Sequence, residues 1–157
     1  MKIKKRYFLK KKKVKELKKE LGDFSAAILD SAKIEMLETD LMDFVLVNNE
    51  PSIIIIDSKP YPTLKSVISN HFELKKVVVD MGAVKFVTNG ADIMSPGIVE
   101  TDEVKPGDVV VITDENHNQP LAIGISLIDG ESMVKNNTGK AIKTIHYISD
   151  DIWNFKF

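Results

Sequence analysis

The spacing of hydrophobic residues predicts a helix, a strand and a hairpin in the first part of the chain. Apolar residues recur three and four positions apart within residues 10–21, among lysines, which is typical of a helix with one buried stripe. Gly22 would end that helix. Residues 33–39 alternate as a strand would, and the apolar runs at 44–47 and 53–56 flank polar turn residues. These two runs favour a β-hairpin.

The segments on either side of this hairpin carry weaker patterns. Residues 1–9 alternate imperfectly and fit either an edge strand or a loose arm. The two prolines within Lys59–Pro62 are expected to break the sheet. The Pro62-Thr63 pair would then begin a short helix that ends near Asn70. We therefore expect a small N-terminal α/β domain over residues 1–74.

From about Lys76 onward the pattern is nearly all strand. Short apolar runs recur at roughly ten-residue spacing with turn signals between them, which suggests a barrel or a sandwich. Gly124 interrupts one run and indicates a bulge or a close backbone approach. A turn at Asp129-Gly130 leads into another short extended segment at 133–135, and Ser149-Asp150 could cap a last helical turn.

The stretch Val77–Val99 is the most specific part of the sequence. Three valines form a short buried strand, and Asp80 follows as a plausible helix N-cap. A short apolar stripe predicts one or two helical turns, which Asn89-Gly90 would end. An extended segment follows, and Pro96-Gly97 ends it. The order is therefore strand, short helix, glycine loop and strand.

The charge is distributed very unevenly along the chain. The formal net charge is −1, from 22 basic and 23 acidic residues. Residues 1–20 hold 11 basic and 2 acidic side chains, a net of +9, which leaves 11 basic and 21 acidic in the rest, a net of −10. A basic end on an acidic body favours a polyanion bound at one face, and a solvated basic tail is the alternative.

Most catalytic and metal chemistry finds no support in the residue pattern. The chain has no cysteine, and its three histidines are too scattered to form a metal site. No serine, histidine and acid set indicates a nucleophilic triad. We therefore expect no catalytic residue, no metal, no cofactor and no enzymatic activity. No apolar run approaches the roughly 20 residues of a membrane helix, so we expect a soluble cytoplasmic protein without membrane contact.

Two glycine-alanine pairs, Gly82-Ala83 and Gly90-Ala91, followed by Met94 and Pro96-Gly97, resemble the opening of a PUA domain, a small RNA-binding module. The ending from Gly139 through Trp153, and Tyr61-Pro62-Thr63-Leu64 in the first half, resemble archaeal relatives of the malignant T-cell-amplified-sequence translation factors. The resemblance implies an α+β fold, in which a small N-terminal α/β domain precedes a C-terminal PUA-like β-barrel with short helices over residues 75–157.

The same resemblance implies where RNA would bind. Phe86 belongs to the implied surface by its position, but for this residue taken individually packing in the core is the better interpretation. Lys140 would contact phosphate from the last strand, and the lysines of the first helix would add auxiliary phosphate contacts. The implied RNA surface comprises Gly82, Ala83, Lys85, Phe86, Asn89, Gly90, Ala91, Met94, Pro96, Gly97 and Lys140, with Lys10, Lys11, Lys12, Lys15, Lys18 and Lys19 as the auxiliary group.

The resemblance also suggests a role. It implies a non-catalytic RNA-binding protein that acts in translation on tRNA or rRNA, contacting the tRNA acceptor end, the small ribosomal subunit or both. An initiation-factor-like protein is the implied protein partner. Two alternatives stay open: an accessory RNA-targeting subunit of a tRNA-guanine transglycosylase or pseudouridine synthase, and a protein–protein adaptor that uses the acidic body.

Overall fold

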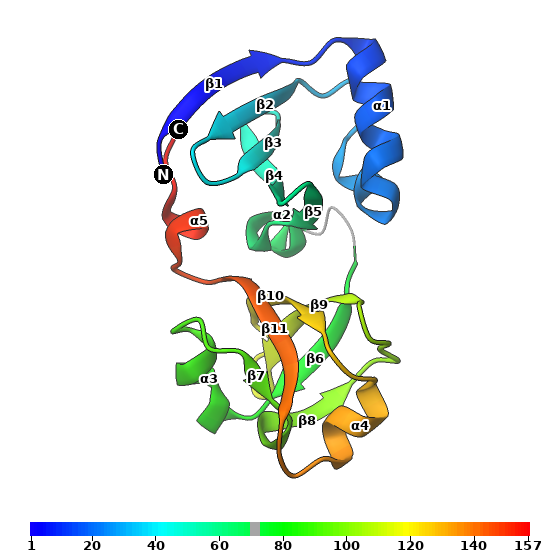
Figure 1. Cartoon of the computed structure of the whole chain (residues 1–157), viewed down its shortest axis with the longest axis vertical. Helices are drawn as coiled ribbons and strands as arrows, with labels where there is room; N and C mark the ends of the chain where they lie inside the picture. The colour runs from blue at the N-terminus through cyan, green and yellow to red at the C-terminus, as the bar shows by residue number, and fades with distance from the viewer. Residues whose placement is uncertain (70–72) are drawn as a thin grey trace. The chain divides into compact units, whose positions relative to one another are not determined.

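The computed structural model describes residues 1–69 and 73–157, and these form two compact units (Figure 1). One unit comprises Met1–Phe72 together with Phe155–Phe157, and the other comprises Glu73–Asn154. The sequence placed the last three residues in the second domain, whereas they pack with the first unit. The expected helix end near Asn70 lies outside the described residues.

In the first unit the described residues form a five-stranded antiparallel sheet in which each strand pairs with the next in sequence. The expected hairpin is present, and its turn is the pair Asn48-Asn49, both with positive φ as a two-residue hairpin loop requires. The strands are β1 (Ile3–Phe8), β2 (Ile34–Thr39), β3 (Asp43–Val47), β4 (Glu50–Ile56) and β5 (Lys59–Pro62).

The prediction that Lys59–Pro62 breaks the sheet is wrong, because this segment is strand β5 and pairs with β4. Proline lacks the backbone N–H that a central strand must donate, but β5 lies at the edge of the sheet, where no second neighbour needs it. Thr63 then caps helix α2 (Leu64–Ile68) by accepting the Ser66 N–H at 3.1 Å.

Helix α1 (Lys11–Leu21) covers one face of this sheet, followed by the 3₁₀ helix η1 (Gly22–Ala27). Leu17 and Leu21 are buried against β-strand residues such as Val45 and Ile53. The apolar stripe of the predicted helix is therefore its buried face, and its lysines remain on the solvent side.

The C-terminal tail Phe155–Phe157 belongs to the opposite face of the same sheet. The Phe155 ring stacks on Phe44 with ring centroids 5.4 Å apart and an interplanar angle of 10°. The Arg6 guanidinium lies 5.5 Å from the centroid of the Phe157 ring. Phe44 is 0% exposed, so a residue from the far end of the sequence helps to bury a strand of the first unit.

The second unit is a curled mixed sheet, with strand order β7-β11-β10-β9-β6-β8 among the described residues. Its two edge strands, β7 and β8, are separated in sequence only by the 3₁₀ helix η2 (Ser95–Gly97), which holds the ends of the curled sheet together. This confirms the PUA-like barrel. The strands are β6 (Lys75–Val79), β7 (Ile93–Met94), β8 (Ile98–Thr101), β9 (Val109–Asp114), β10 (Pro120–Ser126) and β11 (Lys140–Tyr147).

A bulge at Gly124 is confirmed by a register shift between Ile123 and Gly124 in the β10–β11 pair. The extended segment expected at 133–135 is wrong, because residues Gly130–Lys135 form helix α4. Asp129 caps this helix by accepting the Ser132 N–H at 2.9 Å. Met133 supplies its fully buried contact to the barrel core.

Asp150 fixes the end of the barrel, as the cap of helix α5 (Asp151–Asn154) and as partner of a buried histidine. Its carboxylate accepts the Trp153 N–H at 2.8 Å and the Tyr147 N–H at 3.0 Å. His146, only 1% exposed, lies with Nδ1 2.8 Å from Asp150 Oδ2. Burial favours a higher pKa of Asp150, but His146 and the two backbone N–H groups outweigh it and hold that pKa below its usual range.

The pKa of Asp150 gives a pH dependence of stability. Because its folded pKa is depressed, its contribution is present above the unfolded value, about pH 4, and is lost as the pH falls through the folded pKa. We expect Asp150→Asn to cost about 2 kcal/mol at neutral pH and less in acid. Denaturant unfolding of both proteins across this range measures the difference; a gap that widens in acid would contradict the assignment.

Candidate nucleic-acid interface

Asp80 links the buried strand β6 to helix α3 (Met81–Val87) and begins the candidate site. Its carboxylate accepts the Ala83 N–H at 2.9 Å, which confirms the expected N-cap. Val84 and Val87 face the barrel core. Phe86 therefore faces outward, because neighbouring helical residues point about 100° apart.

Two glycines in this stretch permit a turn and a close approach. Gly90 has φ +86°, and a Cβ there would lie 2.6 Å from the Tyr147 ring. At Gly97 a Cβ would lie 3.1 Å from the Ala83 Cβ, so the glycine lets η2 approach α3 closely. The Asp80 N–H also donates to the Gly97 carbonyl at 2.9 Å. The paired glycines thus join the helix, the loop and η2 into one surface.

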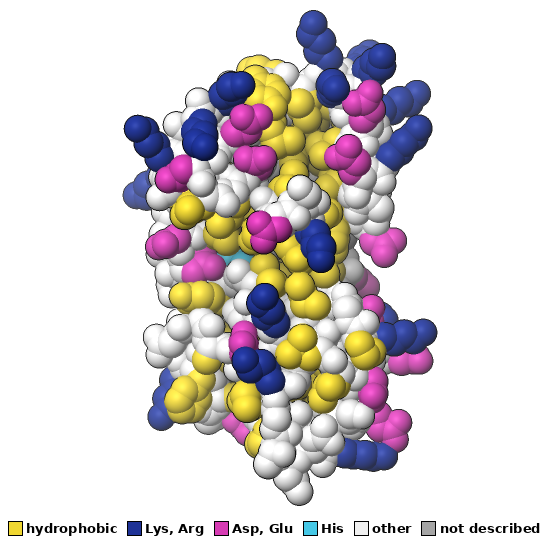
Figure 2. All heavy atoms as spheres, in the orientation of Figure 1, with side chains coloured by type: hydrophobic (Ala, Val, Ile, Leu, Met, Phe, Trp, Pro, Cys, Tyr) yellow, Lys and Arg dark blue, Asp and Glu magenta, His cyan; other side chains and the backbone are white. Residues whose placement is uncertain are grey.

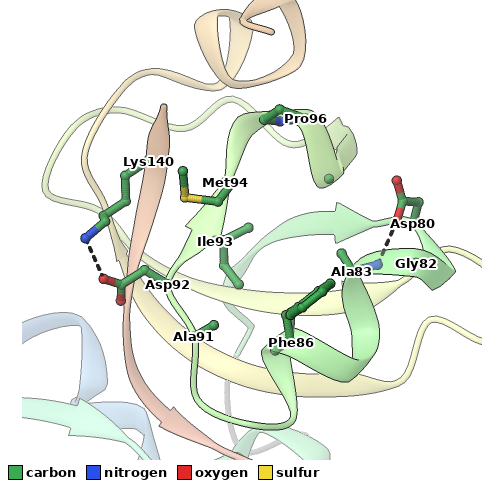
Figure 3. Close-up of a pocket in the computed structure, with 12 residues that line it drawn as sticks. Asp80, Gly82, Ala83, Phe86, Ala91, Asp92, Ile93, Met94, Pro96 and Lys140 are labelled. Carbon is green, nitrogen blue, oxygen red and sulfur yellow. Dashed lines mark hydrogen bonds and ion pairs between the residues drawn. The ribbon is translucent and has the colours of Figure 1, made fainter. Parts of the chain in front are cut away.

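This surface contains a pocket of about 620 Å³ between α3, β7, η2 and the start of β11 (Figure 3). Its walls are mainly apolar: Phe86 is 58% exposed and Met94 is 47% exposed. In Figure 3 the side chains of Phe86 and Met94 lie on opposite sides of Ile93. Exposed apolar side chains around a hollow are typical of a binding site.

Lys140 reaches the same pocket from β11, which pairs with β7 at Met94. Its ammonium forms an ion pair with Asp92 at 3.0 Å (Figure 3). Burial favours a higher pKa of Asp92, but the Thr144 N–H at 2.9 Å and Lys140 outweigh it and lower that pKa. The cation is thus balanced by a carboxylate, and the pocket offers apolar surface more than positive charge.

Eight of the eleven residues expected at an RNA surface line this pocket. The other three, Lys85, Asn89 and Gly90, lie beside it: Asn89 donates to the Lys85 carbonyl at 2.9 Å, and the Lys85 ammonium lies 5.1 Å from the centre of the Phe86 ring. The lining residues from the expected set are Gly82, Ala83, Phe86, Ala91, Met94, Pro96, Gly97 and Lys140.

The interpretation of Phe86 as a core residue is wrong, because its ring is exposed at the pocket. The helix is only seven residues long, and Val84 and Val87 already fill its buried face. The lining also includes Asp80, Val87, Asp92 and Ile93, which the expected set omitted. The alternation of Ala91–Met94 could have indicated that Asp92 and Met94 share a face.

The auxiliary lysines belong to helix α1 of the first unit. Four of them, Lys11, Lys12, Lys15 and Lys18, border a groove there, while Lys10 and Lys19 do not. Within the described residues, no cluster of histidine and carboxylate side chains suited to a metal ion is present. None of the described helices is long and apolar enough to cross a membrane.

The curled barrel, with a short helix, a glycine loop and a Pro-Gly turn after its first strand, defines the class of protein. Residues 75–148 match the model of the PUA domain, and residues 5–70 match a domain of unknown function, DUF1947. A hypothetical protein of Pyrococcus horikoshii superposes with a TM-score of 0.81 at 36% identity, over 95% of this chain and 98% of that one. The protein is thus a PUA-domain protein.

Relatives place it more narrowly. An uncharacterized protein of Methanocaldococcus jannaschii is 47% identical over 99% of both chains. Translation machinery-associated protein 20 of Saccharomyces cerevisiae is 33% identical over 94% of this chain and 86% of that protein. Malignant T-cell-amplified sequence 1 of Danio rerio is 35% identical, over 61% of this chain and 55% of that protein. The chain therefore belongs to the family of translation machinery-associated protein 20 and malignant T-cell-amplified sequence 1, as an archaeal-type relative.

Proposed function

We propose that the chain is a non-catalytic, cytoplasmic RNA-binding protein of the translation apparatus, and that the pocket on its PUA barrel receives a single-stranded RNA end. The observation that carries this proposal is the exposure of Phe86 and Met94 in the lining of an open apolar pocket. Unstacked bases bind to such surfaces by stacking and apolar contact, whereas duplex RNA is contacted through phosphates and 2′-hydroxyls.

The kinship with translation machinery-associated protein 20 supports a role in translation. The single-stranded acceptor end of tRNA is the RNA element whose unpaired bases fit the pocket, and the small ribosomal subunit is the site where such a protein would meet it. The positive end of the chain, net +9 over residues 1–20, would attract the phosphates of the RNA, and salt would weaken this attraction.

The chemistry of the pocket predicts how its variants behave. We expect Phe86→Ser to weaken binding of intact tRNA about tenfold, because stacking one base on an aromatic ring is worth about 1–3 kcal/mol. Fluorescence titration of labelled tRNA, with and without its single-stranded 3′ end, at two salt concentrations, measures this. The variant should bind the two RNAs equally.

Val99→Ser is the matched control, since Val99 is also an exposed apolar residue of the second unit but does not line the pocket. It should bind intact tRNA as the unchanged protein does. Equal binding of intact and shortened tRNA by the unchanged protein would overturn the proposal for the pocket. Absence of binding at low salt would overturn stand-alone RNA binding.

A further inference from the structure

The first unit has a second concavity, of about 790 Å³, between helix α1 and the loop that precedes β2. One side of this groove is cationic and its floor is aliphatic. Lys11, Lys15 and Lys18 are four and three residues apart, which places them on one face of α1, and Lys12 borders the groove beside them. Figure 2 shows hydrophobic side chains exposed next to this lysine-bearing helix.

The aliphatic floor of the groove is formed by side chains that pack against the core of the first unit. Leu9, Val14 and Ala32 are partly buried side chains that pack against the core, and all three line the groove. Leu29 stands at its edge and is 42% exposed. An occupant would therefore extend an existing apolar cluster, and its own apolar side chains would leave water.

The positive charges along the groove are largely unbalanced. Among the described residues of this unit, Lys11, Lys12 and Lys15 form no ion pair, whereas Lys13, on another side of the helix, pairs with Glu16 at 3.3 Å. Lys18 pairs with Asp30 at 3.4 Å across one end of the groove. Asp30 is exposed and Lys18 is only partly buried, so water screens the pair, and an incoming carboxylate could replace Asp30.

We propose that this groove binds an acidic amphipathic segment of a partner protein, with its leucine-like side chains on the aliphatic floor and its carboxylates on the lysines of α1. RNA fits less well, because none of the described side chains that line the groove is aromatic and base stacking has no platform there. The aliphatic floor with a charged border is the arrangement that recognises one face of a short helix. The proposal does not depend on RNA binding by the barrel.

The test uses the full chain and three labelled probes in fluorescence anisotropy. The first is a synthetic peptide of about 15 residues with glutamates and with leucines at helical spacing. In the second peptide the leucines are replaced by serine, and the third probe is a single-stranded oligouridylate. We expect the leucine peptide to bind at least about tenfold more tightly than the serine peptide, because apolar burial adds to charge.

Two double variants separate the groove from net charge. K12Q/K15Q removes two groove lysines, and K13Q/K19Q removes two lysines of the same helix that do not line the groove. Net charge changes equally in both. We expect K12Q/K15Q to weaken the leucine peptide about five- to tenfold and K13Q/K19Q less than about twofold. Leu29→Ser should weaken the leucine peptide about fivefold without affecting the serine peptide.

Three results would overturn the proposal. Equal loss in the two double variants would mean attraction by net charge alone. Oligouridylate that binds more tightly than the leucine peptide, and is lost in K12Q/K15Q, would assign the groove to RNA. A dimer in sedimentation that dissociates in K12Q/K15Q would assign it to a second copy of this chain. None of these results bears on the pocket of the barrel, which is tested separately by tRNA titration of Phe86→Ser.

Discussion

Replacing Gly124 by alanine is expected to destabilise the second unit by about 3 kcal/mol. A Cβ at this position would lie 2.4 Å from the Ile142 Cγ2 and 2.9 Å from the Lys143 carbonyl oxygen. Ile142 is fully buried, and β11 is held in the sheet on both sides, so neither obstacle can move at small cost. The sheet would have to open at the bulge between β10 and β11.

Hydrogen exchange resolved by segment measures this effect. In Gly124→Ala the amides of β9, β10 and β11 should exchange faster, while those of β2–β4 in the first unit keep their protection. Gly82→Ala is the control, because the nearest atom to a Cβ there is the Asp80 side-chain oxygen at 3.3 Å. Its barrel should exchange as the unchanged protein does. Unaltered exchange in Gly124→Ala would contradict the prediction, because it would mean that the bulge can accommodate a Cβ.

Removing Phe155–Phe157 is expected to destabilise the first unit by about 3 kcal/mol. Phe155 covers the ring of Phe44, and the loss combines an aromatic pair, about 1 kcal/mol, with the apolar area of both rings returned to water, about 2 kcal/mol. Arg6 also loses the Phe157 ring. The truncated chain should therefore show faster amide exchange in β2–β4 and unchanged exchange in β9–β11.

Single variants assign the effect of the tail to its rings. Phe155→Ala should reproduce most of the loss, and Lys156→Ala, an exposed neighbour in the same tail, should reproduce none of it. If the first unit kept its full stability without the tail, the stacking on Phe44 would contribute nothing to its core. A fragment that ends before the barrel would lack this cover, and we expect it to be less stable than the intact first unit.

The local elements follow from patterns that act over a few residues. Val14, Leu17 and Leu21 predicted helix α1, and Asp80 was expected as the N-cap that it is, because spacing and capping involve only neighbours in sequence. The errors depended largely on distant partners, although the Asp129 cap of residues 130–135 is a local signal that was read as a turn. Lys59–Pro62 is a strand because the sheet offers it an edge, and residues 130–135 are helical because Asp129 caps them and Met133 fills the barrel.

In the candidate site, too, some features follow from local sequence and others from contacts between distant residues. The two Gly-Ala pairs and Pro96-Gly97 indicated the surface through their resemblance to PUA domains. Only the packed barrel brought Lys140, 46 positions beyond Met94, beside it in register, and placed Asp92 where it pairs with that lysine. The prediction of a phosphate contact at Lys140 did not include this partner, because the pairing of β7 with β11 is set by the curl of the sheet.

By itself the sequence determined the charge asymmetry, the capped helices, the hairpin and the kinship to PUA domains, since each rests on residue identity or short-range spacing. The tertiary structure decided what those features become. Phe86 faces outward because Val84 and Val87 fill the inner face of its helix. Phe155, near the end of the sequence, stacks on Phe44 in the first unit. The tertiary structure also set the lysines of α1 beside an aliphatic groove. Contacts between residues far apart in sequence depend on how complete sheets pack, which local preferences cannot specify.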